Sequence, residues 1–186
     1  MSHVKGSAIT SRIRYVREHF GEEGYRTLLE RLSAADVALI RARILPHEWV
    51  SFELFVNTNV TIDRVFGKGD LQMCFEMGRY SAETNLPTLY RLFYRLGTPM
   101  FIFRKAAQIW NVHYDTGSIR PVADGSGGIR IFMDNVARPH RAHCLSVLGW
   151  AAKSIELSGG KVTEAQERAC RTQGATSCEL VLHYND

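Results

Sequence analysis

The residues with the clearest capacity for chemistry lie in the last 43 residues of the chain. Three of the four cysteines occur there, and together with one glutamate they give the spacing Cys144-x22-Glu167-x2-Cys170-x7-Cys178. Three thiolates and one carboxylate are sufficient to hold a tetrahedral Zn²⁺ ion, and they leave no coordination position for a substrate. We therefore expect a structural metal site, with the function located elsewhere in the fold.

Other interpretations of these residues remain open. Free cysteines are often buried as small apolar residues, and Cys170 and Cys178 would also suit a disulfide across a short turn, although disulfides are rare in a reducing compartment. His143 and His183 are nearby substitutes for any one ligand. Glu167 lies three residues before Cys170, so strict alternation along a strand would place the two on opposite faces. Both can bind one ion only if a bulge or the start of a turn intervenes.

The first half of the chain has the hydrophobic periodicity of helices. Apolar residues recur at helical spacing from Ile9 to Phe20 and again from Tyr25 to Leu32, and Ser33 with Asp36 resembles a capping box. Further helices are expected over 46–66, 71–82, 87–96 and 98–114. Pro46 and Pro99 suit the first helical positions of two of them.

After Gly117 the hydrophobic period changes to two, which is typical of strands. Strands are expected over 118–123, 129–136, 161–170 and 177–184, with a helix over 139–158 between the second and the third. The glycine-rich segment 124–128 predicts a hairpin. N-terminal helices followed by β-β-α-β-β indicate an antiparallel sheet with helices packed against it, which is an α+β fold.

Length and composition fit one domain over residues 1–186, with a helical part at 1–84 and a sheet-containing core at 85–186. The net charge is +4 and the basic residues are scattered, so we expect no nucleic-acid binding. No apolar run reaches transmembrane length and no secretory signal opens the sequence, which predicts a cytoplasmic protein. No catalytic constellation is evident, so we expect no enzymatic activity.

The pattern Glu167-x-x-Cys170-x-x-x-Gly174-x-x-x-Cys178 resembles the C-terminal signature of the 4-vinyl reductase (V4R) domain family. The segment 109–117 is similar to the helix end before that family's first strand. The similarity runs from about residue 85 to the C-terminus and is greatest to small stand-alone V4R-like proteins of myxobacteria. It implies a Bet3-like fold and a structural zinc held by three cysteines and a glutamate, here Cys144, Glu167, Cys170 and Cys178.

Aromatic residues crowd the middle of the chain, and most should belong to the core. A sharper interpretation is an apolar pocket for a small aromatic or acyl ligand, with Trp110, His113 and Tyr114 as polar anchors. Cys74 is better explained as a packed core thiol than as an acylated cysteine.

The leading hypothesis is a non-enzymatic sensor or regulatory domain with structural Zn²⁺, forming a homodimer and acting on a signalling partner. The alternative is a Bet3-like dimeric adaptor without a ligand. An accessory factor in tetrapyrrole metabolism is a third option, suggested only by the family name.

Overall fold

The computed structural model describes residues 2–84, 97–125 and 127–185, and it has an α+β architecture, as predicted. The helix predicted over 87–96 and the start of the predicted core at residue 85 lie outside the described residues. The helices are α1 Gly6–Arg31, α2 Ala34–Arg41, α3 Phe52–Phe66, α4 Gln72–Thr84, α6 Pro99–Gln108, α7 Trp110–His113 and α8 Arg141–Leu157. The strands are β1 His3–Lys5, β2 Trp49–Ser51, β3 Ser118–Asp124, β4 Gly128–Asp134, β5 Lys161–Ala169 and β6 Cys178–Asn185.

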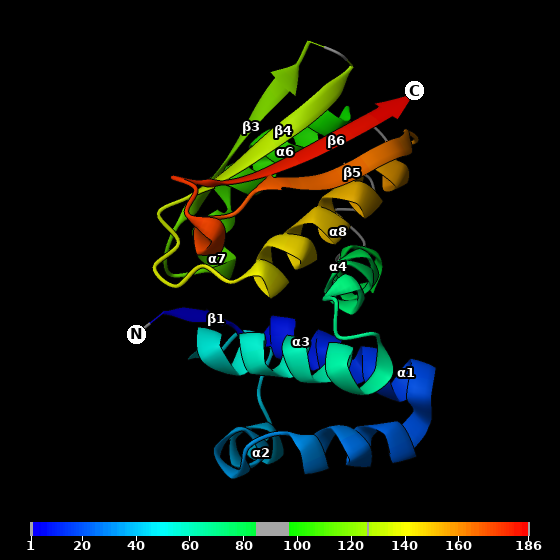
Figure 1. Cartoon of the computed structure of the whole chain (residues 1–186), viewed down its shortest axis with the longest axis vertical. Coiled ribbons are helices and arrows are strands. Elements are labelled where there is room, and N and C mark those ends of the chain that lie inside the picture. Colours follow the sequence, from blue (N-terminus) through cyan, green and yellow to red (C-terminus); the bar gives the residue numbers. More distant parts are fainter. Residues whose placement is uncertain (1, 85–96, 126, 186) are drawn as a thin grey trace.

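The elements form two parts, as Figure 1 shows: helices α1 to α3 at one end, and the four-stranded sheet with α6 and α8 at the other. The sheet is antiparallel with the strand order β3-β4-β6-β5. Helix α8 lies between this sheet and α4 and is therefore buried on nearly every side. The main core forms where α8 packs on the inward-facing side chains of the sheet, such as Ile131 and Leu180.

The N-terminal helices follow their sequence signals except at one start. Gly21 adopts a left-handed φ of 68° and breaks α1 between its two apolar runs, and the Ser33 hydroxyl accepts from the Asp36 amide to cap α2. The prediction that a helix begins at Pro46 is wrong. Helix α3 begins at Phe52, because the Ser51 side chain caps it by accepting from the backbone N–H of Glu53.

The small sheet formed by β1 and β2 was not predicted from the sequence. Its two strands are only three residues long and far apart in the chain, with Val4 opposite Val50. Val4 also forms an isolated bridge with Tyr114, and the His3 ring lies 2.6 Å from the Asp115 carboxylate. This small sheet therefore ties the N-terminus to the chain just before the main sheet.

The helix predicted over 98–114 is divided into α6 and α7. Its start is as predicted, since the Thr98 side chain accepts from the backbone N–H of Phe101 and Pro99 is the first helical residue. Ile109, with φ −105° and ψ 9°, interrupts the helix, and α7 then begins at Trp110.

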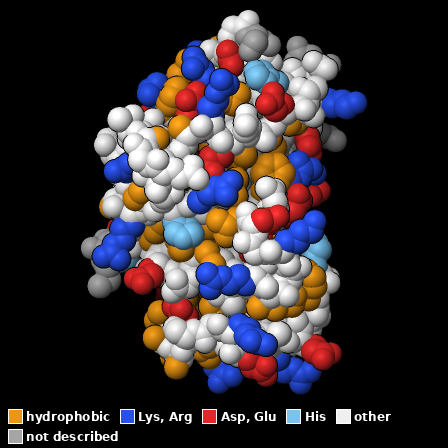
Figure 2. Space-filling model, viewed as in Figure 1, with side chains coloured by type: hydrophobic (Ala, Val, Ile, Leu, Met, Phe, Trp, Pro, Cys, Tyr) orange, Lys and Arg blue, Asp and Glu red, His pale blue; other side chains and the backbone are white. Residues whose placement is uncertain are grey.

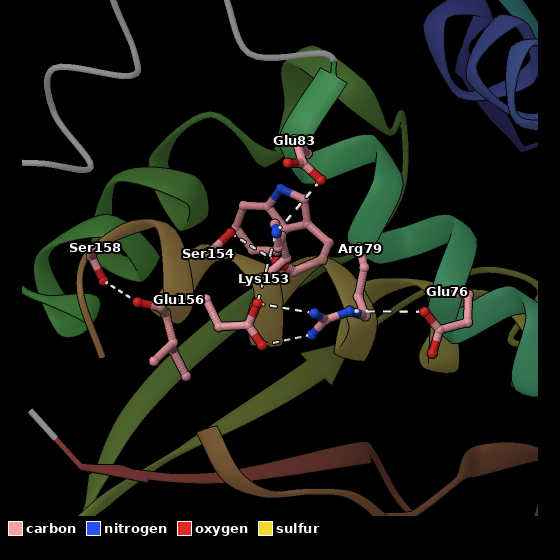
Figure 3. A network of polar contacts seen from close by, with 9 residues as sticks. Glu76, Arg79, Glu83, Lys153, Ser154, Glu156 and Ser158 are labelled. Atoms are coloured by element: carbon pink, nitrogen blue, oxygen red, sulfur yellow. Dashed lines mark hydrogen bonds and ion pairs between the residues drawn. The ribbon is translucent and has the colours of Figure 1, made fainter. Parts of the chain in front are cut away.

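Helices α4 and α8 are in direct backbone contact. A Cβ atom added to Gly149 would lie 1.9 Å from the carbonyl oxygen of Phe75, and one added to Gly78 would lie 2.0 Å from that of Ser146. Figure 3 shows the polar contacts beside this seam, where Arg79 donates to both oxygens of Glu156 at 2.8 and 2.9 Å. The pair is fixed in position, and it sets where α8 presents its side chains.

None of the described helices is long and apolar enough to cross a membrane. Figure 2 shows basic and acidic side chains interspersed over the visible face, which is consistent with the scattered charge of the sequence.

Candidate metal centre

Three cysteine side chains from different elements meet beside the sheet. Cys144 is the fourth residue of α8, Cys170 directly follows β5, and Cys178 begins β6. Their sulfur atoms all lie within 4.8 Å of one another, and all three residues are buried. The α8–sheet packing supplies the first thiol, and the turn between β5 and β6 supplies the other two. This buried cysteine triad can hold a metal ion.

The sulfur spacing suits a shared ion better than a disulfide. Cys170 Sγ and Cys178 Sγ are 4.0 Å apart, about twice the length of an S–S bond, and all four cysteines of the chain are free. A tetrahedral ion with Zn–S bonds of about 2.3 Å holds its sulfurs about 3.8 Å apart. The triad thus needs only a small contraction to enclose Zn²⁺.

Glu167 lies next to the triad without belonging to it. The β5–β6 register shifts between Glu167 and Ala169, which is the irregularity required to bring Glu167 and Cys170 to one side. Its side chain is only 5% exposed, and Oε2 accepts from Nε of Arg141 at 2.6 Å. Oε1 is buried and has no hydrogen-bond partner in the described ranges 2–84, 97–125 and 127–185. A buried carboxylate oxygen without a partner is costly and is rare in folded proteins.

Hydrogen bonds within the triad shift the pKa values of its thiols in opposite directions. The Cys144 thiol donates to the Cys178 sulfur, which lowers the pKa of Cys178 to about 6 and raises that of Cys144. The backbone N–H of Arg171 also donates to Cys178 Sγ at 3.4 Å. Burial raises the pKa of Cys170, and the nearby Glu167 charge acts in the same direction. A thiolate is the form that binds a metal, and the hydrogen bonds to its sulfur favour that form at Cys178.

The two histidines considered as substitute ligands lie elsewhere. His143 neighbours Cys144 in sequence, but its ring packs against Phe52 with centroids 5.0 Å apart, and burial lowers its pKa to about 3. His183 lies between Glu164 and Asp124, at 2.9 and 3.4 Å. Neither belongs to the group of side chains that can share an ion.

Two of the three residues predicted as ligand anchors lie together in the core, and the third is exposed. Trp110 is buried and stacks on Tyr114 with ring centroids 4.3 Å apart, and its indole N–H donates to the carbonyl of Thr116. His113 is exposed. Among the described residues, a pocket of about 360 Å³ opens at α1–α3, lined by Arg31, Leu32, Ser33, Asp36, Val56, Asn57, Val60, Thr61, Arg64 and His140. None of the three predicted anchors lines it.

Cys74 stands apart from the triad, as the sequence suggested. It is 0% exposed within α4, its thiol lies 3.9 Å from the carbonyl oxygen of Asn59, and burial raises its pKa to about 12. These properties are those of a packed core thiol.

Sequence reasoning missed a second polar centre at Arg12. This residue of α1 is 3% exposed and donates to acceptors on α3, α4 and α8. Burial lowers its pKa to about 10. The sequence does contain one sign that Arg12 is buried. Position 12 falls on the same face of the helix as the apolar residues Ile9 and Val16. An arginine on the buried stripe of a helix implies internal hydrogen-bond partners.

No protein-family model matches the sequence, and no curated protein is similar enough in sequence to count as a relative. Solved structures of H-NOX proteins do match over nearly the whole chain. A variant H-NOX protein from K. algicida in the unliganded Fe(II) form has a TM-score of 0.73 at 10% identity, covering 98% of this chain and 97% of that one. The H-NOX protein from S. oneidensis in the Fe(II)NO state also has a TM-score of 0.73, at 12% identity, covering 98% and 99%. The NMR structure of the S. oneidensis SO2144 H-NOX domain in the Fe(II)CO state gives 0.68 at 13% identity, covering 98% and 99%.

The predicted membership of the V4R family is wrong, and the Bet3-like label that came with it is unsupported. The structural matches run over both the helical part and the sheet, and they are to H-NOX proteins. The chain therefore has the H-NOX fold. The predicted element order was correct, whereas the short cysteine and glutamate pattern did not identify the family.

Proposed function

We propose that this chain is a non-enzymatic sensor or regulatory domain of the H-NOX fold, clamped near its C-terminus by a structural Zn²⁺ ion. The observation that carries the proposal is the buried triad of Cys144, Cys170 and Cys178, whose sulfurs lie within 4.8 Å of one another. Three thiolates favour zinc over the harder cations, which prefer oxygen ligands.

Glu167 is the proposed fourth ligand. Its unpartnered Oε1 is the buried acceptor nearest in sequence to the triad's turn, and a bound cation would satisfy it. Oε2 would keep its bond to Arg141, so the carboxylate would bridge the ion and the guanidinium. Such an outer partner orients a ligand and is part of most metal sites.

Charge balance supports the same arrangement. Three thiolates and one carboxylate around Zn²⁺ leave a net charge of about −2, which is costly in a buried site. Arg141 contacts Glu167, and Arg171 donates its backbone N–H to Cys178. These groups offset the excess negative charge without occupying a coordination position.

A site of this kind is structural because all four positions are filled by the protein. The ion would join the first turn of α8 to the β5–β6 turn, which are 23 residues or more apart in the chain. Since α8 also contacts α4 through Gly149, the clamp would fix the geometry between the sheet and the helices next to it.

The sensor part of the proposal is supported by the fold. The matching H-NOX structures are described in NO-bound, CO-bound and unliganded states, so proteins of this fold bind small ligands. A ligand switches a protein only through contacts that differ between two states. A zinc clamp would make α8 and the four-stranded sheet move as one rigid unit. A ligand-induced shift of that unit would then change the surface that a partner contacts. We extend the proposal to a homodimer, the commonest oligomer of soluble proteins, which signals through a protein partner.

The metal part is tested by measuring zinc in protein purified without added metal. The expected result is one Zn²⁺ per chain in the wild type and loss of most of it in Cys170→Ser. Cys74→Ser is the matched control, because this cysteine is equally buried but lies outside the triad. Full zinc in Cys170→Ser, or equal loss in both variants, would refute the assignment.

Native mass spectrometry of the same samples gives the oligomeric state, and a monomer at micromolar concentration would refute the dimer.

A further inference from the structure

The H-NOX name stands for haem nitric oxide/oxygen binding, and the matching structures are described by the state of their iron. A haem held inside a protein needs an axial donor, commonly His, Cys, Met or Tyr, and a flat slot next to that donor. The interior of this chain can be compared with both requirements.

His143 is the one buried imidazole among the described residues, and it is the first candidate for an axial ligand. Its Nε2 atom is buried and has no hydrogen-bond partner among the residues that the structure describes, as a coordinating nitrogen would in the absence of a metal. However, four aromatic rings surround it. The centroid distances are 4.8 Å to Tyr114, 5.0 Å to Phe52, 5.9 Å to Trp110 and 6.0 Å to Phe55. These are contact distances for packed rings, and within the part of the chain that the structure describes they leave no slot for a porphyrin beside the imidazole.

Several other cysteine and histidine side chains among the described residues already have partners. The triad cysteines face one another, and Cys74 is enclosed in the core with its thiol directed at Asn59. His3 pairs with Asp115, while His19 stacks on Tyr15 at 4.0 Å between ring centroids. The sequence of residues 85–96, which lie outside the described structure, contains no His, Cys or Met, and its only donors of the four types are Tyr90 and Tyr94.

The contact between α4 and α8 is also closed, because their backbones touch at Gly78 and Gly149. Between α6 and α8 stands the edge-to-face pair of Phe103 and Trp150, with centroids 5.9 Å apart. Phe103 is 0% exposed. A flat cofactor cannot enter either layer without separating these contacts.

The third layer, between α1 and the helices α3, α4 and α8, is held together by Arg12. Its Nε donates to Asn59 Oδ1 at 3.1 Å, and Nη1 donates to the carbonyl of Met77 at 3.3 Å and to the Ser81 hydroxyl. Nη2 donates to the Ser146 hydroxyl. Among the described residues, no carboxylate forms an ion pair with Arg12, so four neutral acceptors satisfy a buried cation. A single side chain thus joins four helices.

We propose that this chain uses the H-NOX fold without haem, and that the Arg12 hydrogen-bond node and the aromatic cage around His143 form a permanent core. The input sensed by the domain is then something other than a gas bound to haem iron. This inference goes beyond the zinc clamp and is independent of it, because it concerns the helix layers rather than the cysteine triad.

The test adds haemin to the purified, full-length chain in slight excess and follows the absorption spectrum and native mass. The expected result is no 1:1 complex that survives challenge with excess apomyoglobin, and no rise in the unfolding temperature. A stable 1:1 complex with a sharp Soret band would overturn the proposal, whether or not His143→Ala abolishes it.

A second variant tests the node itself. Arg12→Met should lower the unfolding temperature, and haemin should not restore it. An unchanged unfolding temperature would refute the role of Arg12 as the joint between the helices. Zinc is measured in the same samples, so that failure of the metal clamp and failure of the haem-free assignment are read separately.

Discussion

The contact between α4 and α8 makes a sharp prediction for Gly149→Ala. The added Cβ would lie 1.9 Å from the carbonyl oxygen of Phe75 and 2.7 Å from its carbonyl carbon. These are backbone atoms of helix α4, so no side-chain rotation relieves the clash. The helices would have to separate by about 1.5 Å to reach an ordinary contact of 3.4 Å.

The expected cost follows from two opposing effects. Overpacking in a well-packed core costs about 1–3 kcal/mol, and the upper end applies because the obstacle is backbone. Replacing Gly by Ala inside a helix returns about 1 kcal/mol. The net loss of unfolding free energy is therefore about 2 kcal/mol, which lowers the unfolding temperature of a chain of this size by about 4–8 °C.

Thermal unfolding followed by circular dichroism measures this effect. Gly125→Ala is the control, because a Cβ there meets nothing within 4 Å. If Gly149→Ala is as stable as the wild type, or more stable, the two helices do not touch as described. The fixed position of α8, on which both the clamp and the haem-free core depend, would then be incorrect.

Three further predictions concern other parts of the molecule. Arg141→Gln removes the outer partner of Glu167 and should weaken zinc affinity about 10- to 100-fold, as measured by competition with a chelator; unchanged affinity would exclude Glu167 as a ligand oriented by Arg141. Ser33→Ala removes the α2 cap and should cost about 1 kcal/mol in denaturant unfolding, whereas Ser118→Ala, a change of an exposed serine that caps no helix, should cost much less. Glu164 and Asp124 raise the pKa of His183, so its contribution is present below the unfolded pKa and is lost as pH rises through the folded pKa. His183→Asn should therefore lower stability at pH 5.5 but not at pH 9, and an equal effect at both would contradict the pairing.

The sequence predicted most of the fold because its local signals agree with the tertiary structure. The Thr98-Pro99 start, the Ser33 cap and the glycine-rich hairpin all act within a few residues, and each is present. The β1–β2 sheet could not be found in this way, because Trp49–Ser51 is a strand only through its partner near residue 4. The false start at Pro46 has the same origin, since Pro suits both a turn and a first helical position.

The candidate site was predictable in composition but not in detail. The cysteine spacing indicated the triad. The alternation of side chains along a strand indicated that Glu167 needs a bulge to face the same ion as Cys170. Only the structure places that bulge between Glu167 and Ala169. Arg141 as a partner of Glu167 carries no sequence signal, because the contact depends on how α8 lies over β5. The likeness to H-NOX structures could not be predicted from such a short motif, since at 10–13% identity it lies in the fold and not in the residues.

The zinc clamp is tested most directly by X-ray absorption at the zinc K-edge on the purified chain. Our account predicts three sulfur atoms at about 2.3 Å and one oxygen at about 2.0–2.2 Å from the ion. A shell with fewer than three sulfurs, or one containing imidazole nitrogen, would contradict it.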